Sequence, residues 1–148
     1  MFKPSRILVP TDLSENALRA TQQAFDIAKR YGAEVFVLHV VTKPVQTAPL
    51  DYTIDERLVR PLQAELDQSA RNVLQKQLSL IPDADSVNFT TDVRIGNPYE
   101  EVLKEAEAKK IDLIVISAFG LTNLAKLLLG SVARHVMMGA PCSVLLVR

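Results

Sequence analysis

A glycine and a serine, Gly130 and Ser131, stand directly before a segment whose apolar residues have helical spacing, where they could bind an anion. The first turn of a helix has backbone N–H groups without partners inside the helix, and the helix dipole favours negative charge there. Glycine lets the backbone approach a phosphate closely, and Ser131 adds a hydroxyl donor. The same pair would also cap a helix without any ligand, and the spacing alone leaves both interpretations open.

Two turns that follow predicted strands are the other places where a ligand would bind. In an open α/β sheet, ligands lie beyond the carboxyl ends of the strands, where the strand order reverses. This rule selects Pro10–Asp12, after the first strand, and Ser117–Ser131, after the fourth. The known phosphate loops, GxxxxGK followed by Ser or Thr and GxGxxG, are both absent from the sequence. Walker-type and Rossmann-type phosphate binding are therefore disfavoured.

Asp12 directly follows the first predicted strand and has two interpretations. It caps the next helix by accepting backbone hydrogen bonds, or it faces a ligand, where it is the one candidate for binding Mg²⁺. A response-regulator receiver would need an acidic pair here, and only Asp12 is present. The sequence has no P-loop lysine, and His39 is interpreted as a strand-end histidine rather than a catalytic base. No catalytic residue is predicted, and any ATP hydrolysis would be slow.

Strands and helices that alternate along the chain would position these turns. Apolar runs rich in β-branched residues predict strands at 7–10, 35–41, 87–95, 113–116 and 142–147. Helical spacing predicts helices at 17–31, 55–81, 97–110 and 130–138, with a helical turn at 122–129 and a loop at 42–54. Because the strands are separated by helices, we expect a mainly parallel sheet with helices on both faces, in one domain spanning 1–148.

Two of these elements carry finer expectations. In the second helix, the apolar residues are expected on one stripe: Leu62, Leu66, Val73, Leu74, Leu78 and Ile81. Pro61 is expected in the first turn of this helix, where its missing N–H is tolerated, and a kink is the alternative. The third strand alternates apolar and polar residues, which is typical of a position near an edge of the sheet. In the third helix, Asn97 is expected to cap and Pro98 to take the first position.

The composition excludes several classes of protein. The 148 residues carry 17 basic and 17 acidic side chains, whereas nucleic-acid-binding and membrane-surface domains usually have a basic excess. Cys142 is the single cysteine, which excludes an intrachain disulfide and a cysteine-based metal site. No apolar stretch is long enough to span a membrane, and the start of the chain is too short for a signal-peptide core. We expect a cytoplasmic protein that binds neither nucleic acid nor membrane.

Several segments together resemble the universal stress protein family over the whole chain. The most specific ones lie in the last ~40 residues, a longer match than a short motif gives by chance. The matching segments are 7–14, His39-Val40, 96–98, 111–120, 127–133 and 140–147. The resemblance implies a Rossmann-like open sheet of five parallel strands in the order 3-2-1-4-5. It also implies a homodimer in which the last strand, Val144–Val147, pairs antiparallel with its two-fold mate.

The resemblance further implies one of two subclasses. One binds ATP or AMP through Gly-x-x-Gly, nine residues, and Gly followed by Ser or Thr; the other lacks this motif and binds no nucleotide. Here Gly120, nine residues and Gly130-Ser131 are intact, and Ser117 stands at the first glycine position. If that position needs a backbone angle open only to glycine, Ser117 is incompatible with the site. If it has ordinary angles, serine only adds a hydroxyl.

An adenine-nucleotide site is the resulting prediction. Its expected residues are Pro10, Thr11, Asp12, Val40, Ile116, Ser117, Gly120, Gly130, Ser131 and Val132. The resemblance places the first four around the adenosine, the next three along the ribose and phosphates, and the last three at the phosphate. The function expected is a regulatory module of the stress response. The alternatives are a nucleotide-free interaction module of the same fold and a slow ATPase.

Overall fold

The computed structural model describes residues 1–42, 56–120 and 128–148. Most of the expected loop at 42–54 and of the helical turn at 122–129 lies outside these residues. No helix within the described ranges has the length and apolar character needed to cross a membrane.

Five parallel strands form one sheet in the order β3-β2-β1-β4-β5, as predicted. The strands are β1 (Arg6–Thr11), β2 (Glu34–Thr42), β3 (Phe89–Gly96), β4 (Leu113–Ser117) and β5 (Ser143–Val147). Every residue of β4 is buried, which explains its uninterrupted apolar sequence. The alternating strand, β3, lies at one edge of the sheet, and β5 lies at the other.

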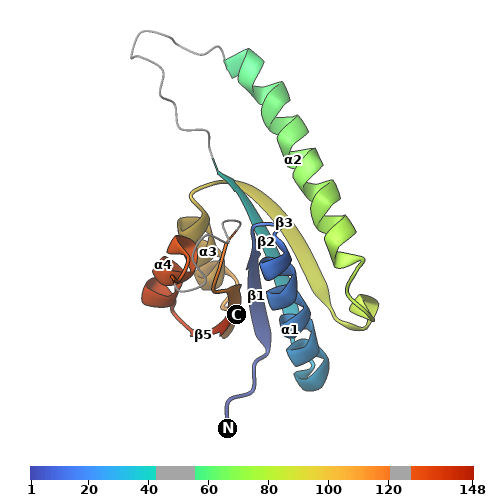
Figure 1. The fold of residues 1–148 in the computed structure, drawn as a ribbon, viewed down its shortest axis with the longest axis vertical. Helices are drawn as coiled ribbons and strands as arrows, with labels where there is room; N and C mark the ends of the chain where they lie inside the picture. Colours follow the sequence, from blue (N-terminus) through green and yellow to red (C-terminus); the bar gives the residue numbers. More distant parts are fainter. Residues whose placement is uncertain (43–55, 121–127) are drawn as a thin grey trace.

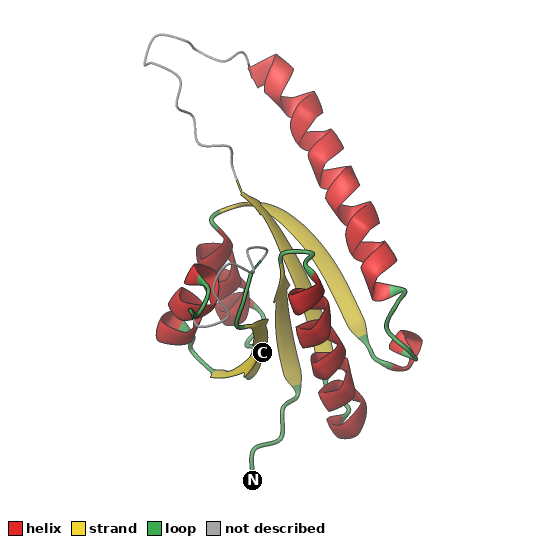
Figure 2. Ribbon diagram, in the orientation of Figure 1, coloured by secondary structure: helices red, strands yellow, loops and turns green. Residues whose placement is uncertain are grey.

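Helices cover both faces of this sheet, also as predicted (Figures 1 and 2). They are α1 (Glu15–Tyr31), α2 (Glu56–Leu78), α3 (Pro98–Ala108) and α4 (Ser131–Gly139). Alternate strand residues point to opposite faces, so Ile7 and Val9 pack with Phe25 of α1 and Leu74 of α2. Leu8 points the other way, into a second apolar cluster with residues of α3 and α4.

Local signals fix where the helices begin and end. Ser14 caps α1 by accepting a hydrogen bond from the Ala17 N–H, and Gly32 ends it in the left-handed conformation at φ 69°. Pro98 takes the first position of α3, as expected. Asn97 occupies the N-cap position of α3, but its side chain makes no capping hydrogen bond. The predicted position of the cap is therefore confirmed, but the hydrogen bond expected from the Asn97 side chain is not formed.

The structure corrects the expected position of Pro61 in α2 and shows how much of the apolar stripe is buried. Pro61 lies in the second turn of a helix that begins at Glu56, and the helix continues through it. The predicted apolar stripe is only partly buried: Leu74 and Leu78 are buried, while Leu62, Leu66 and Val73 are 61%, 50% and 43% exposed. The N-terminal half of α2 reaches past the strands (Figure 1), so the described structure places no sheet residue against that part of the stripe.

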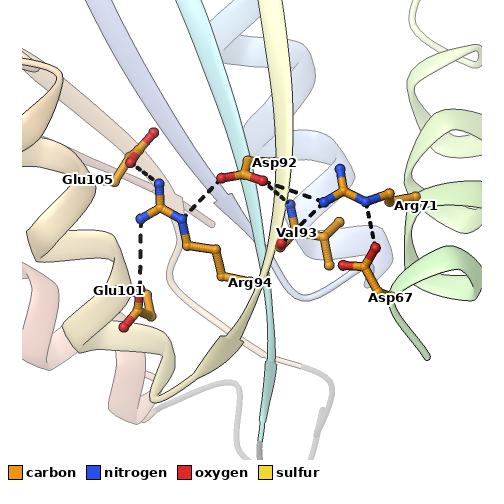
Figure 3. Close-up of polar contacts among 7 residues, drawn as sticks. All are labelled: Asp67, Arg71, Asp92, Val93, Arg94, Glu101 and Glu105. Carbon is orange, nitrogen blue, oxygen red and sulfur yellow. Dashed lines mark hydrogen bonds and ion pairs between the residues drawn. The ribbon is translucent and has the colours of Figure 1, made fainter. Parts of the chain in front are cut away.

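Ion pairs link α2, β3 and α3 across the edge of the sheet (Figure 3). The residues shown there are Asp67, Arg71, Asp92, Val93, Arg94, Glu101 and Glu105. Arg94 pairs with Asp92 at 3.1 Å, with Glu101 at 3.7 Å and with Glu105 in a close contact. Burial lowers the pKa of the Arg94 guanidinium, but the hydrogen bond and charge of Glu105, with those of Asp92, raise it, and the net shift is upward.

The same network closes the outer edge of β3 at Val93. The Val35 N–H of β2 donates to Asn88 O, next to the start of β3. The N–H and C=O groups of a strand point alternately to its two sides. The even-numbered residues of β3 therefore bond to β2, and the N–H and C=O groups of the odd-numbered residues point outward. Among these outward groups, the Val93 N–H donates to Asp92 Oδ1 at 2.9 Å, and Val93 O accepts from Arg71 at 3.4 Å. A strand from another chain could not use these groups without displacing both side chains.

Candidate functional site

A cavity of about 460 Å³ lies at the carboxyl ends of β1, β2 and β4. All ten residues of the predicted site line it: Pro10, Thr11, Asp12, Val40, Ile116, Ser117, Gly120, Gly130, Ser131 and Val132. The position of the cavity follows from the topology. From β1 the chain adds β2 and β3 on one side of the sheet, and β4 and β5 lie on the other side of β1, so the strand order reverses between β1 and β4. The two turns selected from the sequence thus meet at one cavity.

The N-terminus of α4 forms one wall of the cavity and has amides without an acceptor in the helix. Gly130 is the N-cap residue and has no side chain with which to satisfy the first amides of α4. Its own N–H donates to Ala118 O at 2.8 Å, which ties the start of α4 to the turn after β4. Inside the helix, the first main-chain bond is the one from Arg134 N–H to Gly130 O. The N–H groups of Ser131 and Val132, at the first two positions of the helix, therefore have no helical acceptor.

Ser117 has a backbone conformation open to any residue. It is the last residue of β4, and its φ is negative. Its hydroxyl donates to Phe119 O at 2.6 Å and accepts from the Phe119 N–H at 3.2 Å. Of the two alternatives left by the sequence, the structure supports the one in which serine adds a hydroxyl without backbone strain. The side chain folds back on its own turn and leaves the cavity open.

Asp12 does not cap α1, whose N-cap is Ser14, and it lines the cavity. Its Oδ1 accepts from the N–H of Ser14, at 3.0 Å, and from the Ser14 hydroxyl. Its Oδ2 lies 3.4 Å from where a Cβ on Gly120 would stand, so the carboxylate is close to the turn after β4. Among the described residues, no three His, Cys, Asp or Glu side chains gather as a metal site. A cation at Asp12 would therefore need oxygen atoms from a bound ligand or from water.

Sequence reasoning missed part of the wall. The further lining residues are Ala17, Leu38, His39, Val41, Thr42, Pro98, Val102, Phe119 and Ala133. Pro98 and Val102 come from α3, and no local pattern indicates that α3 begins beside the end of β2. His39 Nδ1 lies 2.8 Å from Thr11 O. Because a carbonyl oxygen only accepts, this nitrogen carries the proton, in agreement with the expected strand-end histidine.

Cys142 takes no part in the cavity. It is half-buried, directly before β5 rather than inside it as the sequence predicts. Burial and the nearby negative charge of Asp112 raise the pKa of its thiol, although a backbone hydrogen bond with Ile114 lowers it. The thiol is therefore held in its protonated, less reactive form at neutral pH.

Comparison with known proteins agrees with the fold. A sequence model of the universal stress protein family matches residues 3–148. Universal stress protein MJ0531 of Methanocaldococcus jannaschii is 36% identical over 144 residues, covering 97% of this chain and 81% of its own. The chain belongs to the universal stress protein family.

Solved structures of the family share the whole fold. Universal stress protein UspA from Lactobacillus plantarum superimposes with a TM-score of 0.82 at 29% identity, covering 100% of both chains. A universal stress protein solved in complex with cAMP has a TM-score of 0.68 at 24% identity, covering 99% of this chain and 98% of its own. The universal stress protein fold therefore accounts for the order and direction of all five strands described here.

Proposed function

We propose that this universal stress protein is an adenine-nucleotide-binding regulatory module that works as a homodimer in the cytoplasmic stress response. The observation that supports the proposal is the N-terminus of α4, whose first amides have no acceptor within the helix and whose first residues line a cavity at the carboxyl ends of the strands. Such a helix end binds phosphate through its N–H groups and its dipole. We take the whole chain, 1–148, to act as one domain.

The remaining walls suit the other parts of a nucleotide. Val40 and Ile116 offer apolar surface, while the turn from Pro10 to Asp12 offers backbone groups and a carboxylate for the adenosine. We assign Ser117 and Gly120 to the ribose and phosphates, and the first residues of α4 to the terminal phosphate of ATP or AMP. The fold accommodates such ligands, since a universal stress protein of the same fold was solved with cAMP.

Binding rather than catalysis is the activity proposed. Among the described lining residues, Asp12 and His39 are the two with titratable side chains. The Asp12 carboxylate is used by Ser14, and the protonated nitrogen of His39 is used by Thr11 O. Rapid phosphoryl transfer needs a positioned nucleophile and concentrated positive charge, which these groups do not supply. Any Mg²⁺ at Asp12 would arrive with the nucleotide and help to neutralise its phosphates.

Thermal unfolding with nucleotides tests the proposal directly. A ligand present at about 100 times its dissociation constant adds roughly 2.7 kcal/mol to the free energy of unfolding. For a domain of this size, the midpoint should rise by several degrees with ATP or AMP, in the presence or absence of Mg²⁺. GTP and inorganic phosphate are the controls for the base and for the phosphate alone. If no adenine nucleotide shifts the midpoint, the interaction-module alternative is favoured instead.

The two edges of the sheet favour dimerisation through β5. Residues Val144–Val147 of β5 are only half-buried, and the outer groups of β3 at Val93 are already bonded. An apolar edge strand without a partner tends to pair with another chain. Sedimentation at micromolar concentration should therefore give the mass of two chains. A monomer at that concentration would contradict the dimer and leave the nucleotide proposal standing.

A further inference from the structure

Leu13 has an unusual backbone conformation beside the cavity. Its φ is +66°, in the left-handed region that is unfavourable for a residue with a Cβ and a branched side chain. It follows Asp12, which lines the cavity, and precedes Ser14, which caps α1. Such a conformation persists only where the surrounding structure determines it. The contacts that hold Leu13 therefore also determine the shape of the turn between β1 and α1.

A side chain from α2 makes the long-range contact to this turn. Gln77 Nε2 donates to Leu13 O at 2.5 Å, across 64 positions of the sequence. Gln77 is half-buried and adjoins Leu78, which is buried in the apolar cluster, so α2 is fixed where this contact forms. Within the turn, the Leu13 N–H donates to Thr11 Oγ1 at 3.1 Å.

The contact with Gln77 acts on a single peptide plane. The Leu13 carbonyl and the Ser14 N–H belong to the same planar peptide group. Gln77 holds the carbonyl at one end of this plane, and Asp12 Oδ1 accepts from the N–H at the other end. If the plane rotated, both hydrogen bonds would break together. One of the two hydrogen bonds that orient the Asp12 carboxylate is thus linked to Gln77, and the other comes from the Ser14 hydroxyl.

We propose that Gln77 is a positioning residue for the nucleotide site, acting on the Asp12 carboxylate through the Leu13–Ser14 peptide. This inference rests on the proposed function, because it concerns the affinity of that same cavity. Asp12 lines the cavity with its Oδ2 close to Gly120, so a turned carboxylate would change the space and charge that a nucleotide meets. It follows that α2, which contributes no residue to the cavity wall among those described, sets part of the nucleotide affinity.

Two substitutions at one position separate the hydrogen bond from other effects. Gln77→Glu keeps the size of the side chain and removes the donor, and Gln77→Lys keeps a donor that can reach a carbonyl. Affinities for AMP and for ATP with Mg²⁺ would be measured by calorimetry well below the unfolding midpoint. Losing the hydrogen bond should weaken binding by roughly five- to tenfold in Gln77→Glu. Gln77→Lys should stay within about twofold of the wild type on the same basis.

Gln75→Glu is the matched control, because Gln75 is exposed on the same helix and the substitution introduces the same charge. It should leave both affinities unchanged. The second readout is amide hydrogen exchange at Ser14 in the nucleotide-free protein, which should accelerate in Gln77→Glu and not in Gln75→Glu. A purely structural role of Gln77 would lower the unfolding midpoint without moving either the affinity or the exchange at this one amide.

The outcomes separate this inference from the proposed function. If the wild-type protein binds no adenine nucleotide, the proposed function fails and the inference fails with it. If the wild type binds and Gln77→Glu binds equally well, only the role of Gln77 is overturned. Unchanged exchange at the Ser14 amide in Gln77→Glu would also overturn it, because the peptide would then be held without the glutamine.

Discussion

Gly130→Val is expected to weaken adenine-nucleotide binding by at least about a hundredfold, since hydrogen bonds to a charged group contribute roughly 1.5–3 kcal/mol each. A Cβ at this position would stand 3.4 Å from Ala118 O and 3.7 Å from Gly120 N. The two further methyl groups of valine would then fill the space between the turn after β4 and the start of α4. A phosphate could no longer approach the first amides of α4. Calorimetric titration with AMP and with ATP would measure the loss.

The fold should survive this substitution, so the loss can be assigned to the site. Gly130 has φ −58° and ψ 149°, which any residue adopts without strain. Gly130→Ala is the graded control, because a single methyl group at these distances makes ordinary contacts and should cost only a few-fold in affinity. The unfolding midpoint of both nucleotide-free variants should stay near that of the wild type. If Gly130→Val binds as the wild type does, the phosphate is held elsewhere and the assignment of α4 is wrong.

The features that were predicted well depend on neighbouring residues in the sequence. The uninterrupted apolar run of β4 predicts a strand buried on both faces, and the alternation in β3 predicts an edge position. Both predictions are confirmed. The turns at Pro10–Asp12 and after Ser117 were selected by a rule about the ends of parallel strands. They line the same cavity because the strands that precede them, β1 and β4, are neighbours in the sheet.

The features that were missed depend on contacts with residues that are far away in the sequence. The apolar stripe of α2 indicates which side of the helix is apolar, but not how far the sheet extends beneath it. Leu66 is therefore exposed although its pattern matches that of Leu74, which is buried. The contact between Gln77 and Leu13 gives no signal either. A leucine is not a residue whose type indicates a positive φ. Gln77 lies on the buried side of α2 together with Leu74, but the sequence does not indicate which backbone group its side chain meets.

At the β3 edge of the sheet, the sequence again gives the residue types but not the partners that these residues meet. The sequence places Asp92 and Arg94 on one side of an alternating strand, where solvated charges are the ordinary expectation. In the structure, Arg94 reaches Glu105 of α3, a carboxylate with 6% of its side chain exposed. The helix α3 thus contributes a buried charge that its helical periodicity does not indicate. Removing one partner of this pair should therefore lower the stability of the protein.

Arg94→Ala should lower the free energy of unfolding by about 3 kcal/mol, the low end of the range for removing one partner of a buried ion pair. The low end applies because the Arg94 side chain is 31% exposed, so water partly replaces it. The loss arises because Glu105 stays buried without the positive charge that balances it. Urea unfolding followed by circular dichroism would measure it. Arg71→Ala is the control on the same network, and its exposed pair with Asp67 should contribute at most about 1 kcal/mol.

A double substitution decides whether the unpaired charge is the cause. Arg94→Met combined with Glu105→Leu removes both charges and fills the space with apolar side chains, which is often nearly neutral for a buried pair. The double variant should therefore regain most of the stability that Arg94→Ala loses. If it is as unstable as Arg94→Ala, the unpaired charge of Glu105 is not the cause of the loss. In that case Glu105→Gln alone would have little effect, whereas the ion-pair account expects it to destabilise the protein.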